Sequence, residues 1–169
     1  MTTPPYTLKI AKEDLKFSAA HFTLFPDGSG ELLHGHNYSV SIAISGTELD
    51  EAGLLVDIAA LKKHVRSLCK SYDERTLIPT ESPWLKVEAT SEQIEVRFGK
   101  SLYSLPRKDV VLLPLANLTM ELLAKHLWKQ TANSMSRTSS NILEVEVQET
   151  AGQSCAYRNS LSHQRDSEK

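Results

Sequence analysis

Residues 36–45 show the strictest alternation of side chains in this chain, and the pattern constrains the fold more than any other feature. Tyr38, Val40, Ile42 and Ile44 occupy alternate positions, and from residue 39 onward the positions between them hold only serine or alanine. Successive side chains of a β-strand point to opposite faces. The segment therefore predicts a strand of an antiparallel sheet that buries one face and leaves a small or polar face outside.

Further periodic segments predict an α+β fold. A strand-like pattern covers 6–22, in which Phe17, Ala19 and His21 share one face. The order of two strands, a helix, a hairpin, a helix and two strands differs from alternating β–α units. The other predicted elements are a strand over 36–45, a helix over 56–72, a hairpin over 93–106 around Gly99 and Lys100, a helix over 119–131 with Thr119 as N-cap, and strands over 141–150 and 154–160.

The length of 169 residues and the hydrophobic fraction of 40% suit one domain with a full core. We expect that domain over 6–160, preceded by a short arm over 1–5 and followed by a polar tail over 161–169.

Composition excludes several classes of protein. The 19 basic and 21 acidic residues leave no basic surplus, so we expect no nucleic-acid partner. No apolar run reaches the roughly 20 residues of a membrane helix, and the N-terminus lacks the features of a signal peptide. Two cysteines cannot build a disulfide framework, so a cytoplasmic location is expected.

Three histidines form the first candidate site. His34 and His36 are two residues apart on an extended segment, which places their Cα atoms roughly 6.6 Å apart on one face. His21 ends the preceding strand-like run and would join them if the two strands pair. Three imidazoles with no fourth protein ligand are typical of a catalytic zinc site with an open position. From the residues alone, a metal site and a chance grouping both remain open, whereas His64 and His126 fit core-edge or surface positions on helices.

Several segments together resemble the 6-pyruvoyl tetrahydropterin synthase family over about residues 6–159. They are FSAAHF, LHGHNYSVSIAISG, GLLVDIAALK, NLTMELLAKHLW and VEVQET with the later AYR, and they occur in the family's order. The resemblance implies a zinc ion held by His21, His34 and His36. A redox-neutral reaction on three imidazoles also favours zinc over iron.

The resemblance also implies the tunnelling fold, ββααββ. This is an antiparallel four-stranded sheet with two helices on one face, to which this chain adds an inserted β-hairpin. Sheets of neighbouring subunits would join into a barrel, with active sites at the interfaces. The expected assembly is a homohexamer made of two trimers, which would cover open sheet edges.

The residues before the histidine pair indicate a subtype. The family's usual cysteine lies four residues before the first histidine of HGH, and here that position is Gly30. Glu31 follows it, as in the family's third type, where a glutamate replaces the cysteine. That type implies cleavage of 7,8-dihydroneopterin triphosphate to 6-hydroxymethyl-7,8-dihydropterin. A carboxylate whose pKa is raised by partial burial could serve as base and then as acid. The alternative interpretation of Glu31 is a solvated loop carboxylate.

Two residues are implied in pterin binding. Glu149 continues the alternation of the 141–150 strand, so a charge lies where its apolar face ends. Pattern alone favours a charged strand terminus, but in the family this glutamate binds the amino-pyrimidine edge of the pterin. Thr119 matches a threonine that contacts the pterin, and it also fits a simple helix cap.

One departure concerns the proton relay. The family usually has an Asp-His pair after the first helix, and this chain has Asp73 followed by Glu74. We expect both to belong to the catalytic set, although the missing histidine leaves their route for the proton open. The alternative functions are 6-pyruvoyl- or 6-carboxy-tetrahydropterin synthesis and non-catalytic pterin binding.

Overall fold

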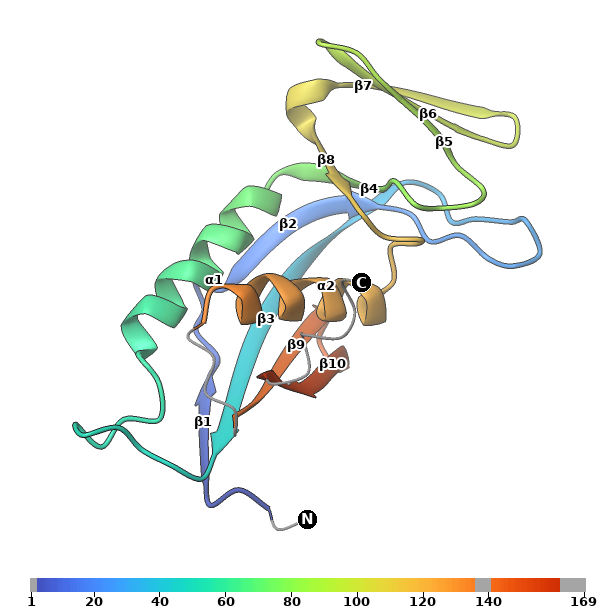
Figure 1. The fold of residues 1–169 in the computed structure, drawn as a ribbon. Coiled ribbons are helices and arrows are strands. Elements are labelled where there is room, and N and C mark those ends of the chain that lie inside the picture. Colours follow the sequence, from blue (N-terminus) through green and yellow to red (C-terminus); the bar gives the residue numbers. More distant parts are fainter. Residues whose placement is uncertain (1–2, 136–140, 162–169) are drawn as a thin grey trace, which may run out of the picture.

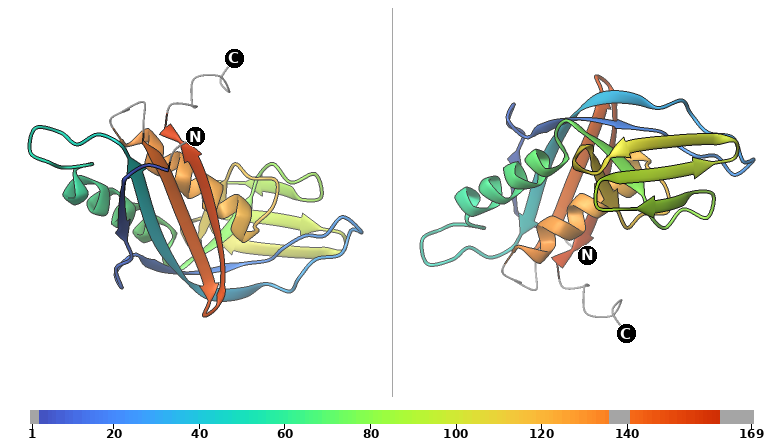
Figure 2. Two further views of the ribbon diagram at one scale, coloured as in Figure 1. Left: turned by 90° about the horizontal axis from the view of Figure 1, so that it is seen from below. Right: turned by 90° about the horizontal axis from the view of Figure 1, so that it is seen from above.

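The computed structural model describes residues 3–135 and 141–161. A large sheet carries two helices on one side, and a smaller sheet lies at one end of the molecule (Figures 1 and 2). The helices are α1 (Ile58–Tyr72) and α2 (Met120–Asn133), with a 3₁₀ turn over Arg107–Asp109. The strands are β1 (Tyr6–Ile10), β2 (Lys16–His21), β3 (His34–Gly46), β4 (Arg75–Pro79), β5 (Lys86–Ala89), β6 (Gln93–Phe98), β7 (Ser101–Pro106), β8 (Val110–Leu113), β9 (Ile142–Thr150) and β10 (Gln153–Ser160).

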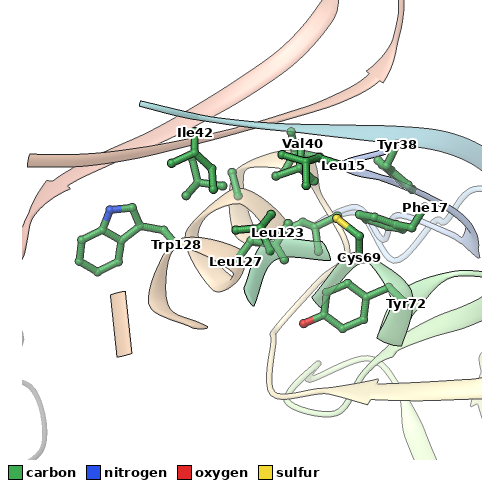
Figure 3. Close-up of a cluster of buried hydrophobic side chains, with 14 of the residues drawn as sticks. Leu15, Phe17, Tyr38, Val40, Ile42, Cys69, Tyr72, Leu123, Leu127 and Trp128 are labelled. Carbon is green, nitrogen blue, oxygen red and sulfur yellow. The ribbon is translucent and has the colours of Figure 1, made fainter. Parts of the chain in front are cut away.

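The alternating segment forms the centre of the large sheet, as predicted. Strand β3 pairs with β9 along one edge and with β1 and β2 along the other, and all three pairings are antiparallel. Its apolar face is buried beneath the helices, where α1 contacts β2 and α2 contacts β9 and β10. The buried side chains that meet there include Phe17, Tyr38, Val40, Ile42, Leu123, Leu127 and Trp128 (Figure 3).

The predicted four-stranded antiparallel sheet was too small. Strands β2, β3, β9 and β10 do form an antiparallel unit, but the sheet has seven strands, with β1 also on β3 and with β4 and β8 added in parallel beyond β2. Leu77 and Ile78 of β4 are both buried, so this strand has no polar face. A short apolar run without alternation gives no strand signal distinct from other buried segments, which explains why β4 and β8 were missed.

The predicted strand over 6–22 is broken in two. Ile10 pairs with Ile42, and Lys16 pairs with Ser39, so residues 11–15 lie opposite only two residues of β3. The break lets the side chain of Leu15 enter the core, where it is fully buried. The expected face of the second part is confirmed, because Phe17, Ala19 and His21 are all buried.

The insert is larger than the predicted hairpin. Strands β6 and β7 pair around Gly99, whose φ of +56° suits a tight turn. Strand β5 pairs with the other edge of β6, and we call these three strands the inserted sheet.

Helix α2 begins directly after Thr119, as predicted, whereas α1 begins at Ile58, two residues later than predicted. Asp57 caps α1 by accepting hydrogen bonds from the backbone N–H groups of Ala59 and Ala60, and Thr119 caps α2. Among the residues that the structure describes, no helix is long and apolar enough to cross a membrane. Leu161, expected as the start of the polar tail, is buried and donates its N–H to the carbonyl of Asn141. Residues 162–169 lie outside the described part of the chain.

Burial of His126 should make the stability of the fold depend on pH. Burial in α2 lowers its pKa from the usual value, and the charge of Lys129 adds to this effect. Below pH about 6.5, the unfolded chain binds a proton here more readily than the folded chain, so acid weakens the fold.

We expect the loss in unfolding free energy between pH 7 and pH 5 to be smaller in His126→Gln than in the wild type. Urea unfolding in EDTA measures this difference, because the other histidines then contribute equally to both proteins. Equal losses in the two proteins would contradict the prediction.

Candidate metal centre

Pairing of β2 with β3 brings the three predicted histidines together. His21 lies directly opposite His34, and Ala19 lies opposite His36. The ring centroids are 4.8 Å apart for His21 and His34, 5.4 Å for His21 and His36, and 4.7 Å for His34 and His36. One ring nitrogen from each residue lies within 4.8 Å of the others, so the group can hold a metal ion.

The buried ring of His21 fits a metal ligand. Its side chain is 5% exposed, and neither ring nitrogen makes a hydrogen bond. Glu149 Oε1 lies 3.1 Å from Nε2, within ion-pair distance but without the geometry of a hydrogen bond. Burial lowers the pKa of His21, and the other two histidines lower it further, against the opposing effect of Glu149. The neutral imidazole is the form that binds a metal.

His34 is oriented by its own chain. Its Nδ1 lies 2.7 Å from the carbonyl oxygen of Leu32. A carbonyl can only accept a hydrogen bond, so Nδ1 carries the proton and Nε2 is left as the ligand atom. This second contact is the usual device that fixes the tautomer and orientation of a metal-binding histidine.

Glu149 lies inside the site. Its Oε1 accepts a hydrogen bond of 3.0 Å from the hydroxyl of Tyr38 and lies 3.3 Å from His36 Nε2. Its other oxygen, Oε2, accepts a longer bond of 3.4 Å from Gln153. Burial raises the pKa of Tyr38, and the carboxylate of Glu149 raises it further, so the hydroxyl stays protonated and acts as a donor. The carboxylate is therefore a positioned acceptor beside the histidines.

Glu31 occupies the loop that joins β2 to β3. Its N–H donates to the carbonyl of Thr23, and its Oε2 accepts from the N–H of Thr23 at 2.9 Å. Burial alone would raise the pKa of this carboxyl group, but the Thr23 bonds and the charges of His34 and His21 outweigh it and lower the pKa. The expectation of a raised pKa was therefore wrong, because it considered burial without these partners. The carboxylate is ionised at neutral pH.

The loop is tied to the start of α2 by residues that the sequence did not single out. Thr23 Oγ1 donates to the carbonyl of Leu118, and Asn117 exchanges hydrogen bonds with the backbone of Leu24. Thr119 follows directly, and its Oγ1 accepts from the N–H of Leu122 at 3.4 Å. An asparagine two residues before an N-cap is a weak signal, because it also fits any turn.

Asp73 and Glu74 lie elsewhere. Asp73 Oδ1 accepts from the N–H of Ser18, and the N–H of Glu74 donates to the carbonyl of Ser18. Glu74 has a φ of +57°, a left-handed conformation that is costly for a residue with a side chain. Within the described ranges of one chain, the two carboxylates make no contact with the three histidines or Glu31. The predicted catalytic set is thus brought together only in part.

Known proteins resemble this chain over most of its length. Residues 9–160 match the family described as 6-pyruvoyl tetrahydropterin synthase. A relative from Methanocaldococcus jannaschii, with the provisional name 6-carboxy-5,6,7,8-tetrahydropterin synthase, is 28% identical over 150 residues, 87% of this chain and 91% of its own. The Bacillus subtilis 6-carboxy-5,6,7,8-tetrahydropterin synthase is 40% identical over 74 residues, which are 43% of this chain and 48% of its own.

Solved structures show the same fold. The 6-pyruvoyltetrahydropterin synthase of Plasmodium vivax superposes with a TM-score of 0.85 at 28% identity, covering 92% of this chain and 98% of that one. The Plasmodium falciparum protein superposes with a TM-score of 0.86 at 25% identity, covering 94% and 99%. The family match spans nearly the whole described domain and includes all three histidines. This chain belongs to the 6-pyruvoyl tetrahydropterin synthase family, whose members are enzymes of pterin biosynthesis.

Proposed function

We propose that this protein is a zinc-dependent lyase that cleaves the side chain of 7,8-dihydroneopterin triphosphate to give 6-hydroxymethyl-7,8-dihydropterin. The observation that carries the proposal is the ionised carboxylate of Glu31, held by Thr23 on the loop that leads into His34. An acid-base group in this place suits proton transfer beside a metal.

The chain's two thiols support a carboxylate as the base. Cys69 is buried in α1, and burial raises its pKa to about 11. Burial also raises the pKa of Cys155 on β10. Neither thiol is therefore activated as a base at neutral pH. A solved Plasmodium vivax structure at 27% identity and a TM-score of 0.84 is a variant in which a catalytic glutamate of that protein is replaced by alanine.

The proposed roles follow from the contacts. Zinc bound by His21, His34 and His36 would polarise the side-chain hydroxyls of the substrate and lower the pKa of the one that loses its proton. Glu31 takes that hydroxyl proton, and the adjacent carbon–carbon bond of the side chain breaks, releasing the triphosphate-bearing fragment as an aldehyde. The pterin ring takes up the electron pair of the broken bond, and Glu31 then returns the proton to the carbon that remains on the ring. Glu149, which Tyr38 orients, accepts N–H bonds from the amino-pyrimidine edge of the pterin.

We also propose that several copies of the chain assemble. The outer edges of β10 and β8 pair with no other strand of the described chain, so further copies could extend the sheet there. In a homohexamer built as a dimer of trimers, Asp73 and Glu74 would contribute to the site of a neighbouring copy. Thr119, at the start of α2, would contact the pterin in addition to capping the helix.

A second candidate rests on the names of the relatives. Several relatives carry the name 6-carboxy-5,6,7,8-tetrahydropterin synthase, with or without a provisional label. Chromatography of the oxidised pterins formed from 7,8-dihydroneopterin triphosphate distinguishes the two reactions. A carboxy- or pyruvoyl-derived product would reject the proposed lyase, and tight pterin binding without turnover would indicate a binding protein.

Metal binding should depend on the histidine cluster alone. We expect the wild type to hold one zinc ion per chain, and His34→Ala to lose it, since a removed ligand should cost more than the roughly 10- to 100-fold typical of an outer partner. His64→Ala is the matched control, because His64 lies on α1 and contacts the carbonyl of Gln130. Metal analysis after dialysis measures the zinc content. Zinc retained by His34→Ala would contradict the assignment.

Removing Glu31 should abolish turnover without releasing the metal. We expect Glu31→Ala to lower kcat by roughly 10²- to 10⁴-fold, the usual contribution of a positioned acid-base group. Glu51→Ala, which removes an exposed carboxylate of the turn before Gly53, should leave kcat unchanged. Formation of 6-hydroxymethylpterin is the readout, with zinc content measured in parallel. Undiminished turnover in Glu31→Ala would show that another group is the base.

Removing the charge of Glu149 should weaken substrate binding. A hydrogen bond to a charged group contributes about 1.5–3 kcal/mol, so we expect Glu149→Gln to raise KM by roughly 10- to 100-fold. Glu146→Gln is the control, because Glu146 contacts Ser41 on the other face of the sheet. Steady-state kinetics on the zinc-loaded proteins measures both. An unchanged KM in Glu149→Gln would exclude this residue as the pterin acceptor.

A further inference from the structure

The inserted sheet packs behind the strand ends that carry the metal-binding histidines. Phe22 follows His21, and Leu33 precedes His34. Both belong to a second hydrophobic cluster. The Phe22 ring stacks on Tyr103 of β7, with centroids 5.5 Å apart. The buried members of this second cluster are Phe22, Leu24, Ile78, Ile94 and Val96. The insert is therefore part of the support of the site.

One contact of the insert reaches the residue before Glu31. A Cβ atom added to Gly30 would lie 2.9 Å from Cε1 of Phe98 and 3.0 Å from Cδ2 of Leu24. Gly30 does not have a positive φ, so a side chain here is opposed by the Phe98 and Leu24 side chains and not by the backbone conformation. Phe98 ends β6, and its ring closes over the backbone of the loop at this point.

The same short segment holds the carboxylate in place. Gly30 forms an isolated antiparallel bridge with Leu24, and the next residues on each side, Glu31 and Thr23, exchange the two hydrogen bonds described above. The contact with Phe98 thus lies one residue from the Glu31 N–H···Thr23 bond. A shift of the loop at Gly30 would carry Glu31 with it.

We propose that Phe98 is a positioning residue for Glu31. Its ring packs on Gly30 and so connects the inserted sheet to the loop between β2 and β3. This contact keeps Glu31 paired with Thr23. The catalytic consequence rests on the proposed function of Glu31. The structural part, the fixed Glu31–Thr23 pair, does not depend on which reaction the protein catalyses.

Amide hydrogen exchange tests the structural part without turnover. In Phe98→Ala we expect the Glu31 N–H, which is bonded to Thr23, to exchange at least about 10-fold faster than in the wild type, because the pair opens locally. Leu102→Ala is the matched control, since Leu102 is a half-exposed residue of β7 in the same insert. Phe98→Leu should restore most of the protection and guards against loss of the fold.

A double variant tests the contact itself. Gly30→Ala should also speed exchange, because its methyl group meets the Phe98 ring. In the double variant Gly30→Ala with Phe98→Ala, the clash with the Phe98 ring is removed and only the 3.0 Å approach to Leu24 is left. Its exchange should therefore be much slower than the product of the two single effects predicts. The proposal would be overturned if the increase in exchange rate in the double variant equalled the product of the two single increases. It would also be overturned if Phe98→Ala and Leu102→Ala exchanged at equal rates.

Kinetics tests the consequence for catalysis. We expect Phe98→Ala to lower kcat by roughly 10- to 100-fold, as a misplacement of about 1 Å can do, with KM within about twofold and zinc content unchanged. A normal kcat in Phe98→Ala would overturn the positioning role. A wild-type protein with no lyase activity would reject the proposed function instead, and the exchange measurements would still decide whether Phe98 holds the loop.

Discussion

The antiparallel register between β2 and β3 is the constraint on which the rest of the site depends. It places His21 opposite His34 and brings His36 to the same face. Side chains alternate along a strand, so a slip of one residue in either strand would send its histidines to the opposite face. The register is held by burial of Phe17 and Tyr38 on that face, whose rings stack with centroids 4.9 Å apart. The hydrophobic core that packs under the helices therefore also assembles the metal site.

Two separate groups of residues hold the site in place. On the helix side, Glu149 and Tyr38 complete the histidine cluster. On the other side, the inserted sheet packs against the loop that carries Glu31. This packing also gives a steric reason for glycine at position 30. A side chain at position 30 would meet Phe98 of the inserted sheet. The next residue, Glu31, is free of this contact and can carry the carboxylate.

The sequence predicted those parts of the fold and site that depend on local pattern. Alternation identified β3 and placed His34 and His36 on one face, and the family resemblance added His21 to them. The Thr119 cap of α2 followed from side-chain chemistry. What it could not supply depends on tertiary contacts. Strands β4 and β8 carry no alternation of apolar and polar side chains, and the break at 11–15 is visible only from its pairing with β3. The lowered pKa of Glu31 likewise depends on a hydrogen bond from Thr23 that no spacing reveals. The separation of Asp73 and Glu74 from the histidines follows from where α1 ends beside Ser18.

The most direct test of the central claim is a crystal structure of the zinc-loaded protein with anomalous diffraction at the zinc edge. We expect one strong anomalous peak, from a zinc ion bound by nitrogens of His21, His34 and His36 at about 2.0–2.1 Å, with an open position toward Glu31. A zinc ion located elsewhere would contradict it. So would a coordination sphere that contains a sulfur ligand at about 2.3 Å, because the site described here has no thiolate.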